Sequence, residues 1–171
     1  MKNKEEIFLK IYKSNKDRIY RICHYYVSDK ELVNDLFQEI LTNIWGNLER
    51  FRGNANIDTW IYRIAINTSI SFVKLVKREC KRKRHIEEVH HGNPLIQDES
   101  KEEIESKIQL LYKGIAQLSI AEKTIISLVI EDASYKEIAK ICNISEGTLR
   151  VRIHRIKKKL QLILKDNIHE I

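Results

Sequence analysis

The chain has 171 residues, and its 31 lysines and arginines outnumber its 24 aspartates and glutamates, giving a formal net charge of +7. Hydrophobic residues make up 43% of the chain, which is enough for a folded core and too much for a disordered protein. Five glycines and one proline cannot supply the turns of a β-sandwich or barrel, so the composition predicts an all-helical protein. Because no stretch is apolar enough for a membrane span or a signal peptide, we expect neither. Three scattered cysteines favour reduced thiols.

The charges are distributed unevenly along the chain. Residues 74–84 hold seven lysines or arginines against one acid, and residues 150–165 hold seven with none. Between these two basic blocks, residues 98–105 are acidic, and the only proline, Pro94, lies shortly before them. We therefore expect two helical domains, at 1–85 and 103–171, joined by a flexible linker at 86–102.

Apolar residues at helical spacing predict three helices in the first domain. The first covers residues 4–26, and the second opens at a capping box of Ser28 and Glu31. The third begins near Asp58, after a break in the pattern at 46–56. Two of the residues that we expect to be buried, at opposite ends of this domain, are Ile7 and Leu75.

Capping boxes also mark the helices of the second domain. A helix at 102–117, with Ile108 on its apolar stripe, is followed by two such boxes. The serine–glutamate pairs are Ser119 with Glu122 and Ser134 with Glu137. The second box opens a very short helix, which ends in a break where Asn143 can take the left-handed conformation. Ser145 then caps a long last helix, whose expected inward residues are Leu149, Ile153, Ile156, Leu160 and Ile163.

The short helix, the turn and the last helix together predict a helix-turn-helix. The last helix must then turn its opposite face outward, and that face carries Gly147, Arg150, Val151, His154 and Lys158. In a recognition helix, Arg150 and His154 would donate to purine acceptors while the flanking cations contact phosphates. The candidate duplex-binding residues are Ser145, Glu146, Thr148, Arg150, Val151, Arg152, His154, Arg155, Lys157 and Lys158. The alternative is an ordinary helical hairpin with a solvated cationic face.

Aromatic residues precede the first basic block. Trp60 and Tyr62 lie upstream of Lys74, Lys77 and Arg78, and aromatic rings beside cations suit unstacked bases of a single strand. The alternative interpretation is a soluble helix end, with cations favourably placed near the C-terminus of the helix dipole and Trp60 in the core.

The whole pattern resembles the sigma-70 family of RNA polymerase sigma factors, in its extracytoplasmic-function subfamily. Residues 35–45, which read Asp-Leu-Phe-Gln-Glu-Ile-Leu at their start and end at Trp45, are similar to the core-binding signature of region 2. Phe51-Arg52-Gly53, residues 59–67 and the basic run are similar to its promoter-opening and −10-reading segment. Residues 118–160 resemble region 4, which reads the −35 element. The departures from the pattern are Asn143 for a common glycine, Ser71 for a frequent aspartate, and Val151 at a usually polar position.

The resemblance implies a role for each of these segments. It implies core polymerase as partner, bound through the β′ clamp helices and the β flap, and the candidate core-binding residues are Asp35, Gln38, Glu39 and Thr42. It implies promoter DNA as duplex and as non-template single strand, with the loop at 51–57 cradling a flipped base. The candidate −10-binding residues are Asn54, Asn56, Trp60, Arg63, Asn67, Lys74, Lys77 and Arg78. The acidic linker would follow the RNA-exit path.

The resemblance further implies a protein of the bacterial cytoplasm, held near the inner membrane where an anti-sigma factor anchors it there. It implies no small-molecule substrate, no cofactor and no insertion into the membrane.

Two other function classes compete with this interpretation. A helix-turn-helix regulator that dimerises through residues 1–85 would bind a symmetric operator without polymerase. An enzyme would need a site, and Cys80, His85, His90 and His91 match no zinc spacing. The sequence also lacks a nucleophile elbow, a P-loop and a dinucleotide fingerprint, so we expect no metal and no catalytic activity.

Overall fold

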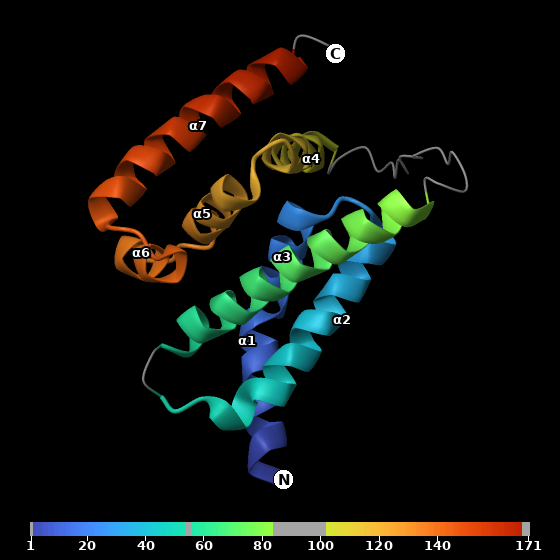
Figure 1. Cartoon of the computed structure of the whole chain (residues 1–171), viewed down its shortest axis with the longest axis vertical. Helices are drawn as coiled ribbons and strands as arrows, with labels where there is room; N and C mark the ends of the chain where they lie inside the picture. Colours follow the sequence, from blue (N-terminus) through green and yellow to red (C-terminus); the bar gives the residue numbers. More distant parts are fainter. Residues whose placement is uncertain (1, 54–55, 84–101, 169–171) are drawn as a thin grey trace.

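A computed structural model describes residues 2–53, 56–83 and 102–168 of the chain. These residues form two groups of helices and no strand (Figure 1). The first group is α1 (Lys2–Tyr26), α2 (Lys30–Asn47), the 3₁₀ turn η1 (Leu48–Arg50) and α3 (Ile57–Lys83). The second is α4 (Glu102–Ala116), α5 (Ile120–Ile130), α6 (Tyr135–Cys142) and α7 (Glu146–Ile168). The predicted all-α class with two helical domains is confirmed, while residues 86–101 of the expected linker lie outside the described residues.

The first group is a three-helix bundle held by one apolar face of each helix. On α2 this face consists of residues spaced three and four apart, which point between α1 and α3. Those residues are Val33, Leu36, Ile40 and Ile44, all of them fully buried. Ile19 and Ile22 of α1 and Ile61 of α3 complete the centre of the bundle.

The cap of α2 differs from the prediction. Asp29, not Ser28, is the N-cap, and its carboxylate accepts hydrogen bonds from the backbone N–H groups of Glu31 at 2.9 Å and Leu32 at 3.0 Å. The predicted box of Ser28 and Glu31 is therefore wrong by one residue. A carboxylate satisfies the same orphan donors as a hydroxyl and also places negative charge at the positive end of the helix dipole.

Three residues expected in the core are exposed instead. The exposed fractions are 41% for Ile7, 51% for Leu75 and 46% for Ile108. Ile7 lies in the second turn of α1 and Leu75 in the C-terminal part of α3, and α2, with 18 residues, is shorter than these two helices, which have 25 and 27. Ile108 lies in the middle of α4. Helical spacing identifies one face of a helix, but a partner helix must be long enough to cover that face.

In the second group, the predicted capping residues are confirmed. Both capping boxes of Ser119 with Glu122 and Ser134 with Glu137 are formed. Asn143 ends α6 in the left-handed conformation, with φ 53° and ψ 49°, as predicted. The chain then turns so that the N–H of Ile144 donates to the carbonyl of Ala139 at 3.0 Å. This turn fixes the angle between α6 and α7.

The long helix α7 buries one face against α4, α5 and α6. Its predicted inward residues Leu149, Ile153, Ile156 and Leu160 are buried, and Ile163 is half-buried. Gly114 of α4 allows the close approach, because a Cβ there would lie 3.3 Å from Cδ2 of Leu164. In the described helices, none combines the length and apolarity that crossing a membrane requires.

The left-handed residue of the turn provides a first prediction. Replacing Asn143 by alanine should lower the free energy of unfolding by about 1 kcal/mol, because alanine resists positive φ. The matched Asn143→Gly variant should keep or raise it, because glycine has no Cβ to clash. Urea unfolding followed by circular dichroism measures both. Equal midpoints for the two variants would contradict a conformational role for this position.

The second capping box gives a prediction about pH. The hydroxyl of Thr59 donates to the Glu137 carboxylate, and this hydrogen bond, with a smaller one from Ser134, holds the pKa of Glu137 below its usual value. A lowered pKa means that the carboxylate stabilises the fold above its unfolded pKa of 4.5 and loses this contribution as pH falls through the folded value.

The charge-removing variant Glu137→Gln tests this sign, because glutamine still accepts in a capping box. We expect wild type to be more stable than the variant at pH 7 and the difference to shrink below about pH 4.5. Urea unfolding at both pH values measures it. A difference that stays constant across this range would show that the carboxylate charge contributes nothing.

Candidate nucleic-acid and polymerase interfaces

The start of α7 is held by a side-chain cap. The Ser145 hydroxyl oxygen accepts from the backbone N–H of Thr148 at 3.2 Å, and its oxygen lies 2.8 Å from the Thr148 hydroxyl. The predicted cap is therefore present. All ten candidate duplex-binding residues from Ser145 to Lys158 are exposed. The first turns of α7 thus present side chains and backbone N–H groups to solvent on the side away from its buried face.

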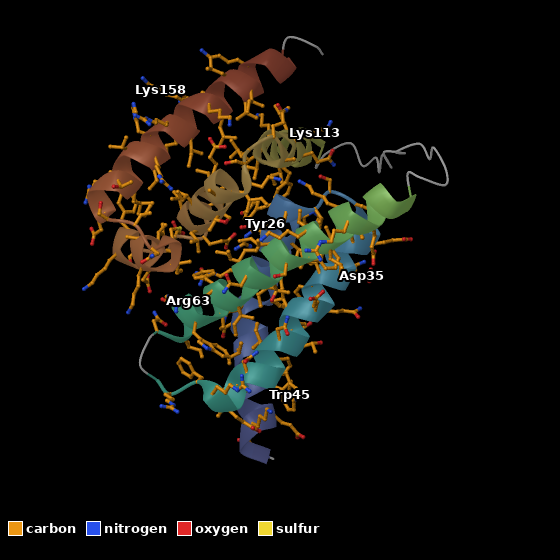
Figure 2. All side chains as sticks on the ribbon, in the orientation of Figure 1. Tyr26, Asp35, Trp45, Arg63, Lys113 and Lys158 are labelled. Carbon is orange, nitrogen blue, oxygen red and sulfur yellow. The ribbon has the colours of Figure 1, made fainter. Side chains whose placement is uncertain are left out.

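The cations of this surface are largely unneutralised. Lys159 pairs with Glu122 at 3.0 Å, and within the described ranges no other basic residue of α7 has an ion-pair partner. The unpaired cations are Arg150, Arg152, Arg155, Lys157, Lys158 and Lys165. In Figure 2, Lys158 projects from α7 away from the rest of the molecule. A cationic surface of this density suits a polyanion.

Arg150 is positioned by the preceding helix. Its guanidinium carbon lies 5.3 Å from the ring centroid of Tyr135, the first residue of α6. The aromatic face attracts the cation and restricts its rotamers, while the guanidinium remains exposed. Tyr135 was not among the predicted site residues, and only the structure brings it beside Arg150.

A second cationic surface lies on α3. Arg63, Asn67, Lys74, Lys77 and Arg78 are exposed along this helix. Trp60 is half-buried and packs against the core with its ring 5.2 Å from that of Phe51, so it is partly core and partly surface. Asn56 is exposed at the start of α3, where its side chain accepts from the N–H of Asp58 at 3.1 Å. Asn54, predicted in the same loop, lies outside the described residues.

A pocket of about 250 Å³ opens between α2 and α3 beside this loop. Its lining residues are Asn43, Asn47, Arg50, Trp60, Ile64, Asn67 and Thr68. The amide of Asn43 donates to Thr68 at 3.1 Å and that of Asn47 to the Asn43 carbonyl at 2.8 Å, which leaves their side-chain oxygens as acceptors. Asn43, Asn47 and Arg50 were not predicted. The sequence did contain one indication of this pocket, because Asn43 and Asn47 are four residues apart and therefore share one face of a helix.

The outer face of α2 is polar. Asp35, Gln38, Glu39 and Thr42 are exposed, on the side of the helix opposite the buried Leu36 and Ile40. The Thr42 hydroxyl donates to the backbone carbonyl of Gln38 at 2.9 Å, one turn earlier in the same helix. Asp35 and Lys158 lie on opposite sides of the molecule (Figure 2). The polar face of α2 is therefore well separated from the cationic surface of α7.

The structure brings α3 and α7 to one cleft that the sequence did not predict. Asn67 and Lys74 of α3 and Arg152 of α7 line this cleft, which has a volume of about 480 Å³. Its other lining residues are mainly apolar and come from α3, α5 and α6. Burial, and the nearby charge of Lys77, hold the pKa of Lys123 below its usual value.

The described residues contain no group of three metal-ligating side chains. Cys80 is an exposed free thiol, and His85, His90 and His91 lie outside the described residues.

Comparison with known proteins assigns the two helix groups. Residues 11–79 match the family model Sigma-70 region 2, and residues 108–160 match Sigma-70, region 4. The chain is 28% identical to the ECF RNA polymerase sigma factor SigW of Bacillus subtilis over 96% of its own length and 92% of the relative. It is 29% identical to the ECF RNA polymerase sigma-E factor of Haemophilus influenzae, over 80% and 76%.

The fold is also that of a solved sigma factor. The structure of RpoE from Bartonella quintana, determined with the anti-sigma factor NepR, superimposes with a TM-score of 0.69 and 23% identity. The match covers 96% of this chain and 98% of that one. The two family models together match 69 and 53 residues of this chain, which is more than half of its length. The chain belongs to the extracytoplasmic-function subfamily of the sigma-70 family of RNA polymerase sigma factors.

Proposed function

We propose that this chain is the subunit that directs bacterial core RNA polymerase to promoters and opens them. The observation that carries the proposal is helix α7, which buries Leu149, Ile153, Ile156 and Leu160 while its cations other than Lys159 face solvent without acidic partners among the described residues. A second cationic surface with an aromatic residue lies on the other domain. Two such surfaces suit two DNA elements that differ in structure, one paired and one opened.

Duplex binding is assigned to the first turns of α7. Arg150, held against Tyr135, and His154, one turn further on, would donate to purine acceptors in the major groove. The remaining cations suit phosphates, whose contacts set register without reading sequence. Those phosphate-binding residues are Arg152, Arg155, Lys157 and Lys158, with Ser145, Glu146, Thr148 and Val151 at the groove surface.

Single-strand binding is assigned to α3 and to the pocket beside it. Carboxamides both donate and accept hydrogen bonds, so Asn47 and Asn67 can match the polar edge of a base, and Trp60 offers a ring for stacking. Removing one base from the stack costs a few kcal/mol, which these contacts offset. Arg63, Lys74, Lys77 and Arg78, together with Asn54 and Asn56 of the loop, would then hold the strand on either side.

Polymerase docking is assigned to the polar face of α2. Asp35, Gln38, Glu39 and Thr42 would bind the β′ clamp helices, and the second domain would bind the β flap. Charged groups at such an interface mainly steer and orient the partner. The proposal places domain boundaries at 1–85 and 103–171 with a linker at 86–102, and the two family matches at 11–79 and 108–160 support this division.

The cellular setting follows from the same proposal. A chain that works on promoter DNA would act in the bacterial cytoplasm and would have no catalytic activity of its own. Nucleotide turnover without polymerase would contradict that expectation. The solved relative bound to NepR supports an anti-sigma factor as a further partner of this chain.

Transcription from a randomised promoter library tests the proposal. With core polymerase and this chain, the transcribed templates should be enriched in two separated motifs upstream of the start site. The charge-reversed variant Asp35→Lys/Glu39→Lys should lose polymerase pull-down and transcription while keeping its circular dichroism spectrum. Core-independent binding to a symmetric duplex, without any chain-dependent transcript, would instead favour an operator-binding regulator.

Two substitutions on α7 separate reading of bases from binding of phosphates. Arg150→Ala should lose about 1–3 kcal/mol of discrimination at one position of the upstream motif. Lys157→Ala should weaken binding to all sequences alike and reduce the salt slope by about 1. Competition binding at several salt concentrations measures both. A uniform loss of affinity in both variants would overturn the assignment of this face.

A further inference from the structure

The cleft between α3 and the helices α5, α6 and α7 is large enough for a small molecule. Its volume is about 480 Å³, and sites for small ligands commonly measure about 300–1,000 Å³. Helix α3 forms one side of the cleft, and α5 and α6 lie beside it (Figure 1). The first turns of α7 reach the same cleft through Arg152. Its chemistry therefore comes from four helices.

The walls of this cleft are apolar. The hydroxyl of Thr124 donates to the carbonyl of Ile120 at 2.9 Å and also lies 2.8 Å from that of Tyr26, so its polar atom is already occupied. Burial raises the pKa of Cys142, so this thiol stays neutral and packs like a small apolar group. The aliphatic lining residues are Ile66, Ile70, Ile120, Ala121, Ile125 and Ile141. Such walls suit a hydrocarbon chain rather than a polar ligand.

The charged groups of the cleft are all positive. Lys74 of α3 and Arg152 of α7 line it, and no acidic residue does. Both cations are exposed, and neither has an ion-pair partner among the residues that the structure describes. The charge of Arg152 also reaches Cys142, where it opposes the rise of the thiol pKa. An anionic group placed here would meet two cations, and a carboxylate can accept two hydrogen bonds from one guanidinium.

The volume of the cleft favours a single chain over a helix. Two turns of an α-helix that is about 10 Å across occupy about 850 Å³, which is more than the cleft holds. A water molecule takes about 30 Å³ in the liquid, and a methylene group is of similar size, so the cleft holds about 16 such groups. A straight chain of about ten carbons with its head group therefore fits.

We propose that this cleft binds a straight-chain carboxylate, the chemistry of a free fatty acid, with its chain between the aliphatic walls and its head group on Lys74 and Arg152. Both cations are also assigned to DNA, so the carboxylate and promoter DNA compete for them. This competition rests on the proposed function, whereas binding of the carboxylate is a property of the chain by itself.

Titration calorimetry of the full chain with decanoate, below the concentration at which it forms micelles, tests the site. Each buried methylene contributes about fourfold in affinity, so octanoate should bind about 15-fold more weakly than decanoate. Decyltrimethylammonium carries the same ten-carbon chain with a cationic head group, and it should not bind. Equal affinities for these three amphiphiles would show unspecific adsorption and would overturn the proposal.

Two arginines of α7 provide a matched pair of variants. Arg152→Gln should weaken decanoate binding about tenfold, because it removes a charge-assisted hydrogen bond. Arg155→Gln removes the same charge from the same helix outside the cleft, and its affinity should stay within about twofold of wild type. Equal effects of the two variants would mean that the head group does not bind in the cleft, which contradicts the proposal.

A third variant fills the cleft. Ala121 is an exposed lining residue of α5, so Ala121→Phe places a ring in the cleft without changing the core. It should abolish decanoate binding and keep the circular dichroism spectrum of wild type. Decanoate binding equal to that of wild type would place the ligand elsewhere and overturn the proposal. Binding of an amphipathic helical peptide of leucine and glutamate in place of decanoate would instead assign the cleft to a protein segment.

Forked promoter DNA tests the competition. With decanoate at ten times its dissociation constant, wild type should bind this DNA about tenfold more weakly, whereas Ala121→Phe should be unaffected. DNA binding that decanoate does not weaken would overturn the competition. If decanoate binds as expected but no version of the chain binds promoter DNA or supports transcription, the carboxylate site stands and the proposed function fails.

Discussion

The structure depends on one constraint, which is that a charge held within a protein must have a partner. Four of the acidic residues have a partner within the same chain: Asp29 caps α2, Glu122 pairs with Lys159, Glu131 pairs with Arg21, and Glu137 caps α6. Apart from Lys159, the exposed cations of α3 and α7 have no such partner within the described ranges. An excess of positive charge in a chain of net charge +7 is thereby concentrated on two surfaces. Because these cations have no acidic partner, they are available to bind a polyanionic ligand.

Local features were predictable because their determinants lie within a few residues. The box of Ser134 and Glu137 and the left-handed Asn143 each depend on one turn of chain, and both are confirmed. Exposure of Ile7 and Leu75 was not predictable, since it depends on how far neighbouring helices extend. The pairing of Arg21 with Glu131 spans 110 residues, and no sequence pattern relates the two.

The candidate site likewise contains features that one helix determines and features that two helices make together. The outward face of α7 follows from helical spacing once Leu149, Ile153 and Ile156 are placed inside, and those burials are confirmed. The pocket beside α3 combines side chains of two helices, so neither helix alone reveals it. Tyr135 likewise meets Arg150 only because the turn between α6 and α7 sets their angle. Surfaces made by one helix are readable from sequence, and those made by two are not.

The contact between the two domains is held by polar side chains as well as by apolar packing. An apolar contact of the same extent would leave a hydrophobic patch on each domain after separation, and such patches favour aggregation or unspecific binding. Arg21, Tyr25, Tyr62 and Glu131 are instead polar groups that water can solvate. Because a buried ion pair gains little net stability but fixes geometry, the pair of Arg21 and Glu131 defines one arrangement of the two domains.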